Sequence, residues 1–424
     1  MESLLQAFPL SSQEGLALMR LAEALLRVPD QDTMALLLSD QLKQADFSQH
    51  ASEANHTTHP LLEGFSARLL HLASQIMQGD QTQFLQRLSQ RTVVSATLHA
   101  LQTLGQQFVL GQTIEEATDL ALKQSRTDRE ERHLTTWSFD MLGEGARTWA
   151  DADRYLQAYQ DALKQISQVD WPASDSPALR ERPGLSIKLS ALHPRFEAPR
   201  RHQVLQELMP RLLPLVTEAA RRNIMLTIDA EESHRLELQL AVLSALVTSL
   251  EHDTTLREWS GLGLAIQAYQ LRASAMIQAV VHLAQRHQRR LTIRLVKGAY
   301  WDAEIKRAQE LGLPGYPVFT RKAHTDLSYL ACAHQLLAHT DLIYPQFATH
   351  NAATIGAVLH LSEQAQVPPD AFEFQRLHGM GERIYQAMRL NEAHAPALRV
   401  YAPVGAHRDL LAYLVRRLDR KSVV

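Results

Sequence analysis

Residues 225–251, which read MLTIDAEESHRLELQLAVLSALVTSLE, decide the fold class of this 424-residue chain. The first six residues, MLTIDA, form an apolar run of strand length. The stretch 235–251 then places aliphatic side chains at the three- and four-residue spacing of an amphipathic helix. A strand followed by a helix, repeated along a chain, predicts an α/β protein with parallel strand pairing.

The same unit recurs from residue 137 to residue 404. The eight strand-length runs are 137–142 (WSFDML), 185–189 (LSIKL), 225–230 (MLTIDA), 262–267 (LGLAIQ), 291–296 (LTIRLV), 345–350 (PQFATH), 372–377 (FEFQRL) and 399–404 (RVYAPV). Eight units in a span close to the usual ~250 residues favour a (βα)8 barrel over the alternative, an open α/β sheet.

The residues before the first run carry helical patterns and a polar connector. We expect a helical arm with its connector over 1–60, a helical linker domain over 61–134, and the barrel over 135–424. The connector 47–60 contains or adjoins His50, His56, His59 and His71. Their irregular spacing in a polar segment favours a solvated loop, and we expect no metal site.

Composition excludes several classes of function. Lys plus Arg number 43 against 46 Asp plus Glu, a formal net charge of -3, which argues against a basic nucleic-acid-binding module. The sole cysteine, Cys332, cannot form an intramolecular disulfide, so a cytoplasmic setting is expected. The sequence contains neither a signal peptide nor an apolar run of about 18 residues, and no membrane-spanning segment is expected.

In a barrel, chemistry is expected at the C-terminal ends of the strands. Charged residues within LSIKL, LTIDA and LTIRLV interrupt strands that should be apolar, which favours a functional site there over internal pairing alone. The polar strand-end residues are Asp140, Glu144, Lys188, Asp229, Glu231, Glu232, Gln267, Arg294, Lys297, Thr349, His350, Asn351, Arg376, His378 and Tyr401.

Two further segments suggest an anionic, aromatic ligand. The predicted helix 407–420 (HRDLLAYLVRRLDR) places Tyr413, Arg416 and Arg417 on one side, where two guanidinium groups suit a carboxylate or phosphate. The run 294–301 (RLVKGAYW) combines two cations, a glycine and two aromatic residues at one predicted barrel mouth. A Rossmann G-x-G-x-x-G motif is absent from the sequence.

Long motifs in a consistent order now identify a resemblance. They are SFDMLGE (138–144), LSIKLSALHPRFE (185–197), LTIDAEES (226–233), AIQAYQLRA (265–273), RLVKGAYWDAEIKRAQ (294–309), GYPVFTRKAHTDLSYLA (315–331), PQFATHNA (345–352), EFQRLHGMGE (373–382) and YAPVGAHRDLLAYLVRRL (401–418). With these motifs the chain resembles the proline dehydrogenase domain of the bacterial proline utilization A flavoenzymes. The resemblance implies a distorted (βα)8 barrel whose last helix caps its mouth.

The resemblance also implies a reaction and a substrate site. The reaction is FAD-dependent oxidation of L-proline to Δ1-pyrroline-5-carboxylate, the first step of proline catabolism, with electrons passing to a membrane quinone. Arg416, Arg417 and Lys188 would bind the proline carboxylate, and Glu144 would pair with Arg416 to hold the capping helix closed. Asp229 would lie beside Lys188. The ring would be walled by Tyr300, Leu377, Tyr401 and Tyr413.

For the cofactor, the resemblance implies three groups of FAD-binding residues. Arg294 would lie near flavin N5, with Asp229 and Ala230 close by. Gln267, Val296, Lys297, Gly298, Ala299 and Trp301 would follow the isoalloxazine ring and the ribityl chain. Thr320, Lys322, Thr349, His350 and Asn351 would reach the phosphates and the adenosine. The resemblance thus gives the residues in the run 294–301 a common ligand.

The chain departs from the family after RRL, where DRKSVV replaces an acidic-Asn-Gly stretch that in the family helps to hold the adenosine. The aldehyde dehydrogenase domain of bifunctional members is not found here, so such a domain or partner is expected elsewhere. We also expect the protein to be able to bind peripherally to the inner face of the cytoplasmic membrane. The sequence does not determine whether it forms a homo-oligomer. The alternatives are another flavin barrel, similar to methylenetetrahydrofolate reductase, and a catalytically silent regulatory scaffold.

Overall fold

The computed structural model describes residues 109–130, 133–172, 179–253, 256–391 and 395–405. These residues lie in one compact unit of the chain. The expected arm over 1–60, most of the expected linker, and the predicted capping helix 407–420 lie outside the described residues. The division into domains at residues 60 and 134 stays a prediction.

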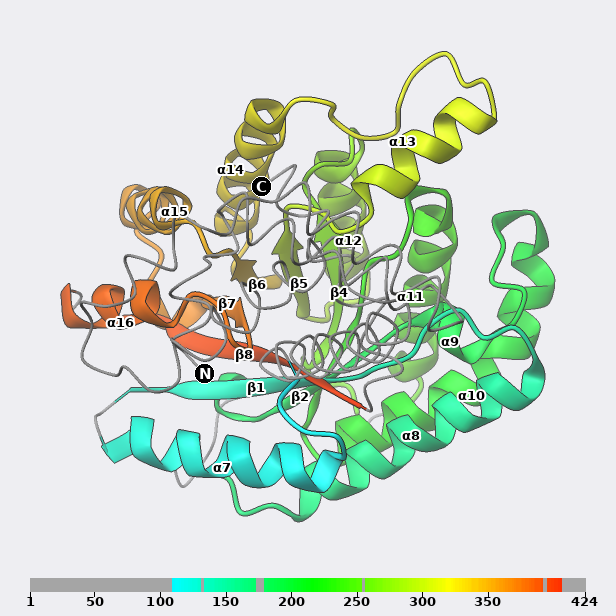
Figure 1. The fold of residues 1–424 in the computed structure, drawn as a ribbon. Helices are drawn as coiled ribbons and strands as arrows, with labels where there is room; N and C mark the ends of the chain where they lie inside the picture. The colour runs from blue at the N-terminus through cyan, green and yellow to red at the C-terminus, as the bar shows by residue number, and fades with distance from the viewer. Residues whose placement is uncertain (1–108, 131–132, 173–178, 254–255, 392–394, 406–424) are drawn as a thin grey trace, which may run out of the picture. The chain divides into compact units, whose positions relative to one another are not determined.

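Eight parallel strands form a closed barrel in the order β1 to β8, with the last strand paired to the first (Figure 1). The strands are β1 (Thr135–Met141), β2 (Gly184–Ile187), β3 (Met225–Ile228), β4 (Leu262–Gln267), β5 (Leu291–Val296), β6 (Ile343–Ala348), β7 (Glu373–Leu377) and β8 (Ala397–Val404). Closure rests on the β1–β8 register, which pairs Thr135 with Leu398 at one end and Met141 with Val404 at the other. The expected barrel is confirmed, and the open sheet is excluded.

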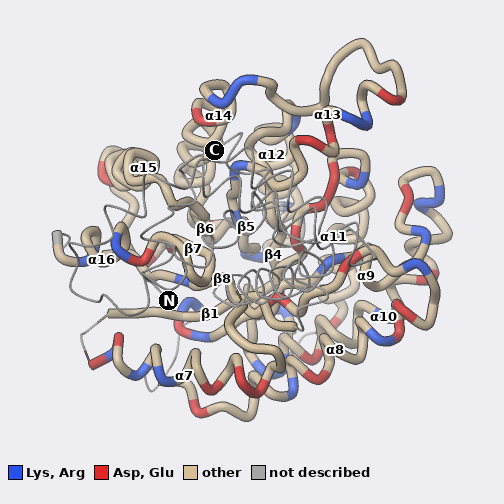
Figure 2. Tube along the Cα trace, viewed as in Figure 1, with Lys and Arg blue, Asp and Glu red and all other residues tan. Residues whose placement is uncertain are grey.

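Helices surround the strands, in the order that a (βα)8 barrel requires (Figure 1). They are α7 (Ile114–Glu130), α8 (Trp149–Gln168), α9 (Leu189–Leu192), α10 (Arg201–Arg221), α11 (Leu236–Glu251), α12 (Ala273–Arg286), α13 (Trp301–Glu310), α14 (Lys322–Leu337), α15 (Ala352–Gln364) and α16 (Glu382–Asn391). Figure 2 shows both signs of charge interspersed along the outer helices α7, α8 and α10.

Local signals set where several helices begin. Thr148 and Asp151 form a reciprocal capping box at the start of α8, each side chain accepting from the backbone of the other. The Asn351 side chain accepts from the Thr354 backbone N–H at 2.9 Å and caps α15. The second and third strands end two residues earlier than their apolar runs, because helix α9 begins directly after Lys188 and the pairing of β3 with both neighbouring strands stops at Ile228.

The side chains of each strand alternate between two environments. Apolar residues such as Phe139, Ile187, Ile228 and Leu295 are almost completely buried in the core between the strands and the helices. The alternate positions carry polar and charged side chains that contact one another inside the barrel, both across it and between neighbouring strands. The inside of this barrel is therefore a polar network rather than the layers of branched apolar residues common in the fold.

Candidate active site

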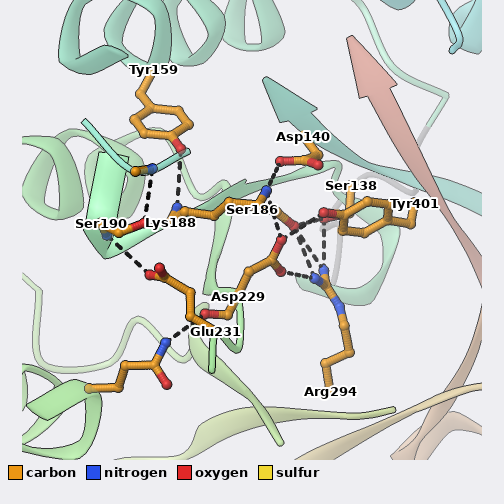
Figure 3. A network of polar contacts seen from close by, with 12 residues as sticks. Ser138, Asp140, Tyr159, Ser186, Lys188, Ser190, Asp229, Glu231, Arg294 and Tyr401 are labelled. Carbon is orange, nitrogen blue, oxygen red and sulfur yellow. Dashed lines mark hydrogen bonds and ion pairs between the residues drawn. The ribbon is translucent and has the colours of Figure 1, made fainter. Parts of the chain in front are cut away.

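The C-terminal ends of five strands bring charged and hydroxyl side chains into one network inside the barrel (Figure 3). Its members are Ser138, Asp140, Ser186, Lys188, Asp229, Arg294 and Tyr401. Since β5 and β1 are not neighbours, the contact between Arg294 and Ser138 can only cross the barrel interior. The fold therefore assembles a site from residues up to 263 positions apart in the sequence.

Asp229 lies directly after β3, at the centre of this network. Its Oδ1 accepts from Nη1 of Arg294 at 2.6 Å. Its Oδ2 accepts from the Tyr401 hydroxyl at 2.6 Å and from the Lys188 ammonium at 3.4 Å. The Asp229 side chain is only 10% exposed, so it lies in the same buried environment as Lys188 and Arg294. Its negative charge compensates these two cations, whose burial without a partner would cost free energy.

Lys188 has a second and closer anionic partner in Asp140, with Nζ 2.6 Å from Oδ1. Burial alone would lower the pKa of Lys188, but Asp140, Tyr401 and Asp229 together raise it well above its usual value. Burial raises the pKa of Asp140, with the Asp229 charge adding to the effect and Lys188 opposing it. Lys188 therefore stays a cation throughout the physiological range.

Arg294, on β5, donates five hydrogen bonds inside the barrel. Nε donates to Oε1 of Gln375 at 2.7 Å. Nη1 donates to Asp229 and to Ser186, and Nη2 donates to Ser138 and to Ser186. A guanidinium group has five N–H bonds, so this set fixes the plane and the direction of the Arg294 cation.

Tyr401, on β8, joins both parts of the network. The Arg294 guanidinium carbon lies 5.0 Å from the centre of the tyrosine ring, within the range of a cation–π contact. Burial raises the pKa of the Tyr401 hydroxyl well above its usual value, and the carboxylates Asp140 and Asp229 add to this. Tyr401 therefore stays a neutral hydrogen-bond donor to Asp229.

Gln267, at the end of β4, holds two strand-end loops together. Its amide Nε2 donates to the carbonyl of Glu231 at 2.8 Å, and its Oε1 accepts from the backbone N–H of Ala299 at 3.1 Å. The neighbouring Gly298 lies against the ring of Tyr269, because a Cβ atom at Gly298 would come within 2.5 Å of ring carbons. A tyrosine of the same protein therefore occupies the space beside this glycine.

Lys297 and Lys322 converge on the carboxylate of Asp326. Lys297 Nζ lies 2.5 Å from Oδ1, and Lys322 Nζ lies 2.8 Å from Oδ2. Burial opposes the change, but hydrogen bonds from the two lysines lower the pKa of Asp326. Thr320, two residues before Lys322, is exposed. The fold thus brings together two cations that are 25 positions apart in the sequence.

The residues after β6 shape the neighbouring strand end. The imidazole Nε2 of His350 accepts from the backbone N–H of Leu377 at 2.9 Å, which requires a nitrogen without a proton. Thr349 Oγ1 accepts from the backbone N–H of Asn351 at 3.2 Å, while Asn351 caps α15. These three predicted cofactor residues therefore hold the loop and the helix start in place.

The remaining predicted site residues lie at the same end of the barrel. Leu377 ends β7 and is buried, whereas Tyr300 and Trp301 at the start of α13 are half-buried. The Trp301 indole N–H donates to the carbonyl of Phe319 at 3.0 Å. Val296 and Ala230 are half-buried at the ends of β5 and β3.

Part of the predicted site lies outside the described residues. This part comprises Tyr413, Arg416 and Arg417, together with the ion pair predicted between Arg416 and Glu144. Glu144 itself follows β1, at the end of the barrel where the network lies. The predicted carboxylate clamp and the closing ion pair stay predictions.

The structure adds residues to which the sequence assigned no role. They are Ser138, Ser186 and Gln375, all buried; Asp140, also buried, was predicted only as a polar strand-end residue. Each of the three uncharged residues lies two positions from a charged residue of the same predicted strand, which places both side chains on one face of the strand but does not specify their contacts. Ser138 and Asp140 are two apart, as are Ser186 and Lys188.

No group of three or more His, Cys, Asp or Glu side chains in the described residues is arranged to hold a metal ion. None of the helices in the described ranges combines the length and the apolar character that a membrane crossing requires.

Two family models match the chain. The model described as proline dehydrogenase matches residues 121–420. The model described as the DNA-binding domain of proline dehydrogenase matches residues 1–108, a region outside the described residues. Together the two models account for most of the sequence.

Curated and solved relatives agree with the first model. The bifunctional protein PutA of Salmonella typhimurium is 46% identical over 426 residues, which cover 98% of this chain and 31% of that protein. Proline dehydrogenase 1 of Bacillus subtilis is 26% identical over 74% of this chain and 85% of its own length. A crystal structure of a Bradyrhizobium japonicum proline utilization A mutant has a TM-score of 0.70 and 48% identity, covering 99% of this chain and 41% of that one. This chain thus spans under a third of the length of the PutA relative.

Proposed function

The chain belongs to the proline dehydrogenase family, and from this membership we propose that it oxidises L-proline to Δ1-pyrroline-5-carboxylate with FAD as cofactor. The observation that carries the proposal is the network around Asp229, which holds Lys188 and Arg294 as buried cations at the C-terminal end of the barrel. A substrate carboxylate and an electron-rich cofactor both require positive charge at this end.

The residues present fit the chemistry of FAD. Its phosphates are anionic, and Lys297 and Lys322 supply two neighbouring cations in a region that also contains the exposed Thr320. Its ring is planar and polar at one edge, and Arg294 supplies a cation in a fixed orientation. Gln267 holds the backbone at Ala299, where the ring would lie. When bound, FAD supplies the acceptor for a hydride.

The chain's own residues bind and orient the substrate in this proposal. Lys188, with Arg416 and Arg417, would bind the proline carboxylate, and Tyr401, Tyr300, Tyr413 and Leu377 would confine the ring. The substrate amine must lose a proton before hydride leaves the adjacent carbon. The raised pKa of Lys188 keeps that side chain protonated, so we assign it to carboxylate binding and not to the role of base.

The wider setting follows from the same membership and is likewise proposed. Electrons would pass to a quinone at the membrane surface, with the protein cytoplasmic or peripheral on the inner face of that membrane. The aldehyde dehydrogenase activity of bifunctional relatives would belong to another domain or partner. We keep the expected division of the chain into an arm over 1–60, a linker over 61–134 and the barrel.

The second family model, over 1–108, carries a DNA-binding description, which bears on whether this chain binds nucleic acid. The near-neutral composition of the chain argues against sequence-independent DNA binding, since such binding depends on neutralising many phosphates. We propose that this chain does not bind DNA. Retardation of a labelled duplex at about 150 mM salt would contradict this, and the competing description would then apply.

A visible spectrum of the purified protein tests the main proposal. We expect a yellow protein whose flavin absorbance bleaches when L-proline is added without oxygen. Bleaching by a reduced nicotinamide but not by proline would favour the reductase alternative. A yellow protein that proline does not bleach would favour the silent scaffold. A colourless protein that cannot be reconstituted with FAD would refute the proposal.

A further inference from the structure

A second buried ion pair lies deeper in the barrel than the site. Arg399 on β8 and Glu373 on β7 form a bidentate pair, with Nε to Oε1 at 2.7 Å and Nη2 to Oε2 at 3.1 Å. The two side chains are 1% and 0% exposed. Arg399 also donates to backbone carbonyls, including that of Arg182 at 2.7 Å. Such a pair is held rigidly, since either charge alone would be costly to bury.

The Glu373 carboxylate accepts from two glutamine amides, that of Gln346 on the neighbouring strand β6 and that of Gln375 on β7 itself. Gln346 Nε2 lies 2.7 Å from Oε1, and Gln375 Nε2 lies 2.8 Å from the same oxygen. Both glutamines are 1% exposed. Only Gln375 reaches the site, since its Oε1 accepts from Nε of Arg294 at 2.7 Å. Gln375 therefore joins the deep ion pair to the cation of the active site.

The charges on either side determine how the Gln375 amide is oriented. An ionised carboxylate can only accept hydrogen bonds, so the NH2 group of Gln375 must face Glu373. A guanidinium group can only donate them, so the carbonyl oxygen must face Arg294. A neutral amide of this length satisfies both partners, whereas a glutamate would place a second carboxylate against Glu373. The orientation is thus imposed by the network and cannot reverse without losing both bonds.

We propose that Gln375 is a positioning residue, which uses the buried Arg399–Glu373 pair as an anchor to hold the Nε edge of Arg294. Through Gln375 the plane of the Arg294 guanidinium is fixed before any ligand arrives. This inference rests on the proposed function, because it gives Arg294 the task of stabilising negative charge on the reduced flavin. The preorganised cation favours the reduced form without needing to reorient during the reaction.

Gln375→Met tests the proposal, with Gln346→Met as its matched control. Both changes remove one amide donor to Glu373 from a buried strand position, but only Gln375→Met removes the acceptor from Arg294. For Gln375→Met we expect the preference of the protein for reduced over oxidised flavin to fall about tenfold, which lowers a two-electron potential by about 30 mV. The kcat for proline should fall, with its KM little changed, because the carboxylate-binding cations are untouched. Gln346→Met should leave the potential and this kcat near the values of the unaltered protein.

Crystal structures of both variants without flavin give a readout that does not depend on activity. We expect the Arg294 guanidinium to rotate in Gln375→Met and to stay in place in Gln346→Met. If Gln375→Met does not fold, Gln375→Asn replaces it, since the shorter amide cannot span both partners. Equal shifts of potential in the two variants, or an unmoved Arg294 in the Gln375 variant, would overturn the proposal. If the unaltered protein binds no FAD, the proposed function fails by itself, and the crystal structures still decide whether Gln375 positions Arg294.

Discussion

The carboxylate of Asp229 can be neutralised with little change of shape by the substitution Asp229→Asn. This carboxylate faces Lys188 and Arg294, whose side chains are 6% and 3% exposed. After the substitution Lys188 keeps Asp140 at 2.6 Å, but Arg294 loses its 2.6 Å carboxylate partner. The variant therefore leaves the barrel interior with one uncompensated positive charge.

The expected cost follows from the burial of these groups. Removing one partner of a buried ion pair typically costs about 3–5 kcal/mol. The amide oxygen of an asparagine can still accept a hydrogen bond from Tyr401 or Arg294, which places the loss near about 3 kcal/mol. If the free energy of unfolding falls by about 3 kcal/mol per molar urea, this loss should lower the urea concentration at the unfolding midpoint by about 1 M.

Tryptophan fluorescence during urea unfolding measures this effect in the barrel, because all five tryptophans lie between residues 137 and 301. Glu197→Gln is the matched control. Glu197 also lies between two cations, Arg195 and Arg200, but on the surface, where solvent screens the charges. The control should leave the midpoint unchanged. An unchanged midpoint in Asp229→Asn, or equal losses in the two variants, would refute the reasoning from burial.

Three further outcomes are expected. Burial, assisted by the Arg376 charge, lowers the pKa of His378 in the folded protein to about 4. Between about pH 6.5 and pH 4 the unfolded chain therefore binds more protons than the folded protein does. The free energy of unfolding should fall by up to about 3 kcal/mol over this range as the pH is lowered. His378→Gln should flatten that part of the urea-stability profile, and an unchanged profile would contradict the assignment. Gly298→Ala should destabilise the protein by about 1–3 kcal/mol and lower its unfolding midpoint, because the added methyl group overpacks against Tyr269. Gly315→Ala is the control and should leave the midpoint unchanged, since the space around Gly315 is open. Equal unfolding midpoints in the two variants would contradict the contact with Tyr269. Arg416→Met should raise the proline KM by the equivalent of about 2–4 kcal/mol while FAD stays bound, and flavin release instead would show that the predicted clamp is wrong.

The barrel was predictable because its strands are short and their apolar runs are separated by helix-length segments. The run 262–267 coincides with β4, and 291–296 coincides with β5. Errors occur at strand ends, as for β6, which begins at Ile343 rather than at Pro345. Apolar character continues past such ends, and only the backbone pairing to neighbouring strands determines where the strand begins.

Within the site, charged strand residues were easier to predict than neutral ones. Lys188, Asp229 and Arg294 stand out because a charge in a buried strand needs an explanation. Ser138 and Gln375 carry no charge, and small or amide side chains on strands are common, so their contacts with Arg294 could not be inferred. Asp140 was noted at a strand end, but its pairing with Lys188 depends on the parallel register between β1 and β2.

By itself the sequence determined that eight strand–helix units follow one another and that cations and a carboxylate stand at their ends. It also determined the family, through long motifs in a fixed order. Only the tertiary structure decided which charges are partners. Closure of the barrel brings Arg294 on β5 against Asp229 after β3, Gln375 on β7 and Ser138 on β1, at distances of 3.0 Å or less. Hydrogen bonds and ion pairs depend on separations in space of a few ångströms, and the order of residues along a chain does not specify those separations until the strands are closed into a ring.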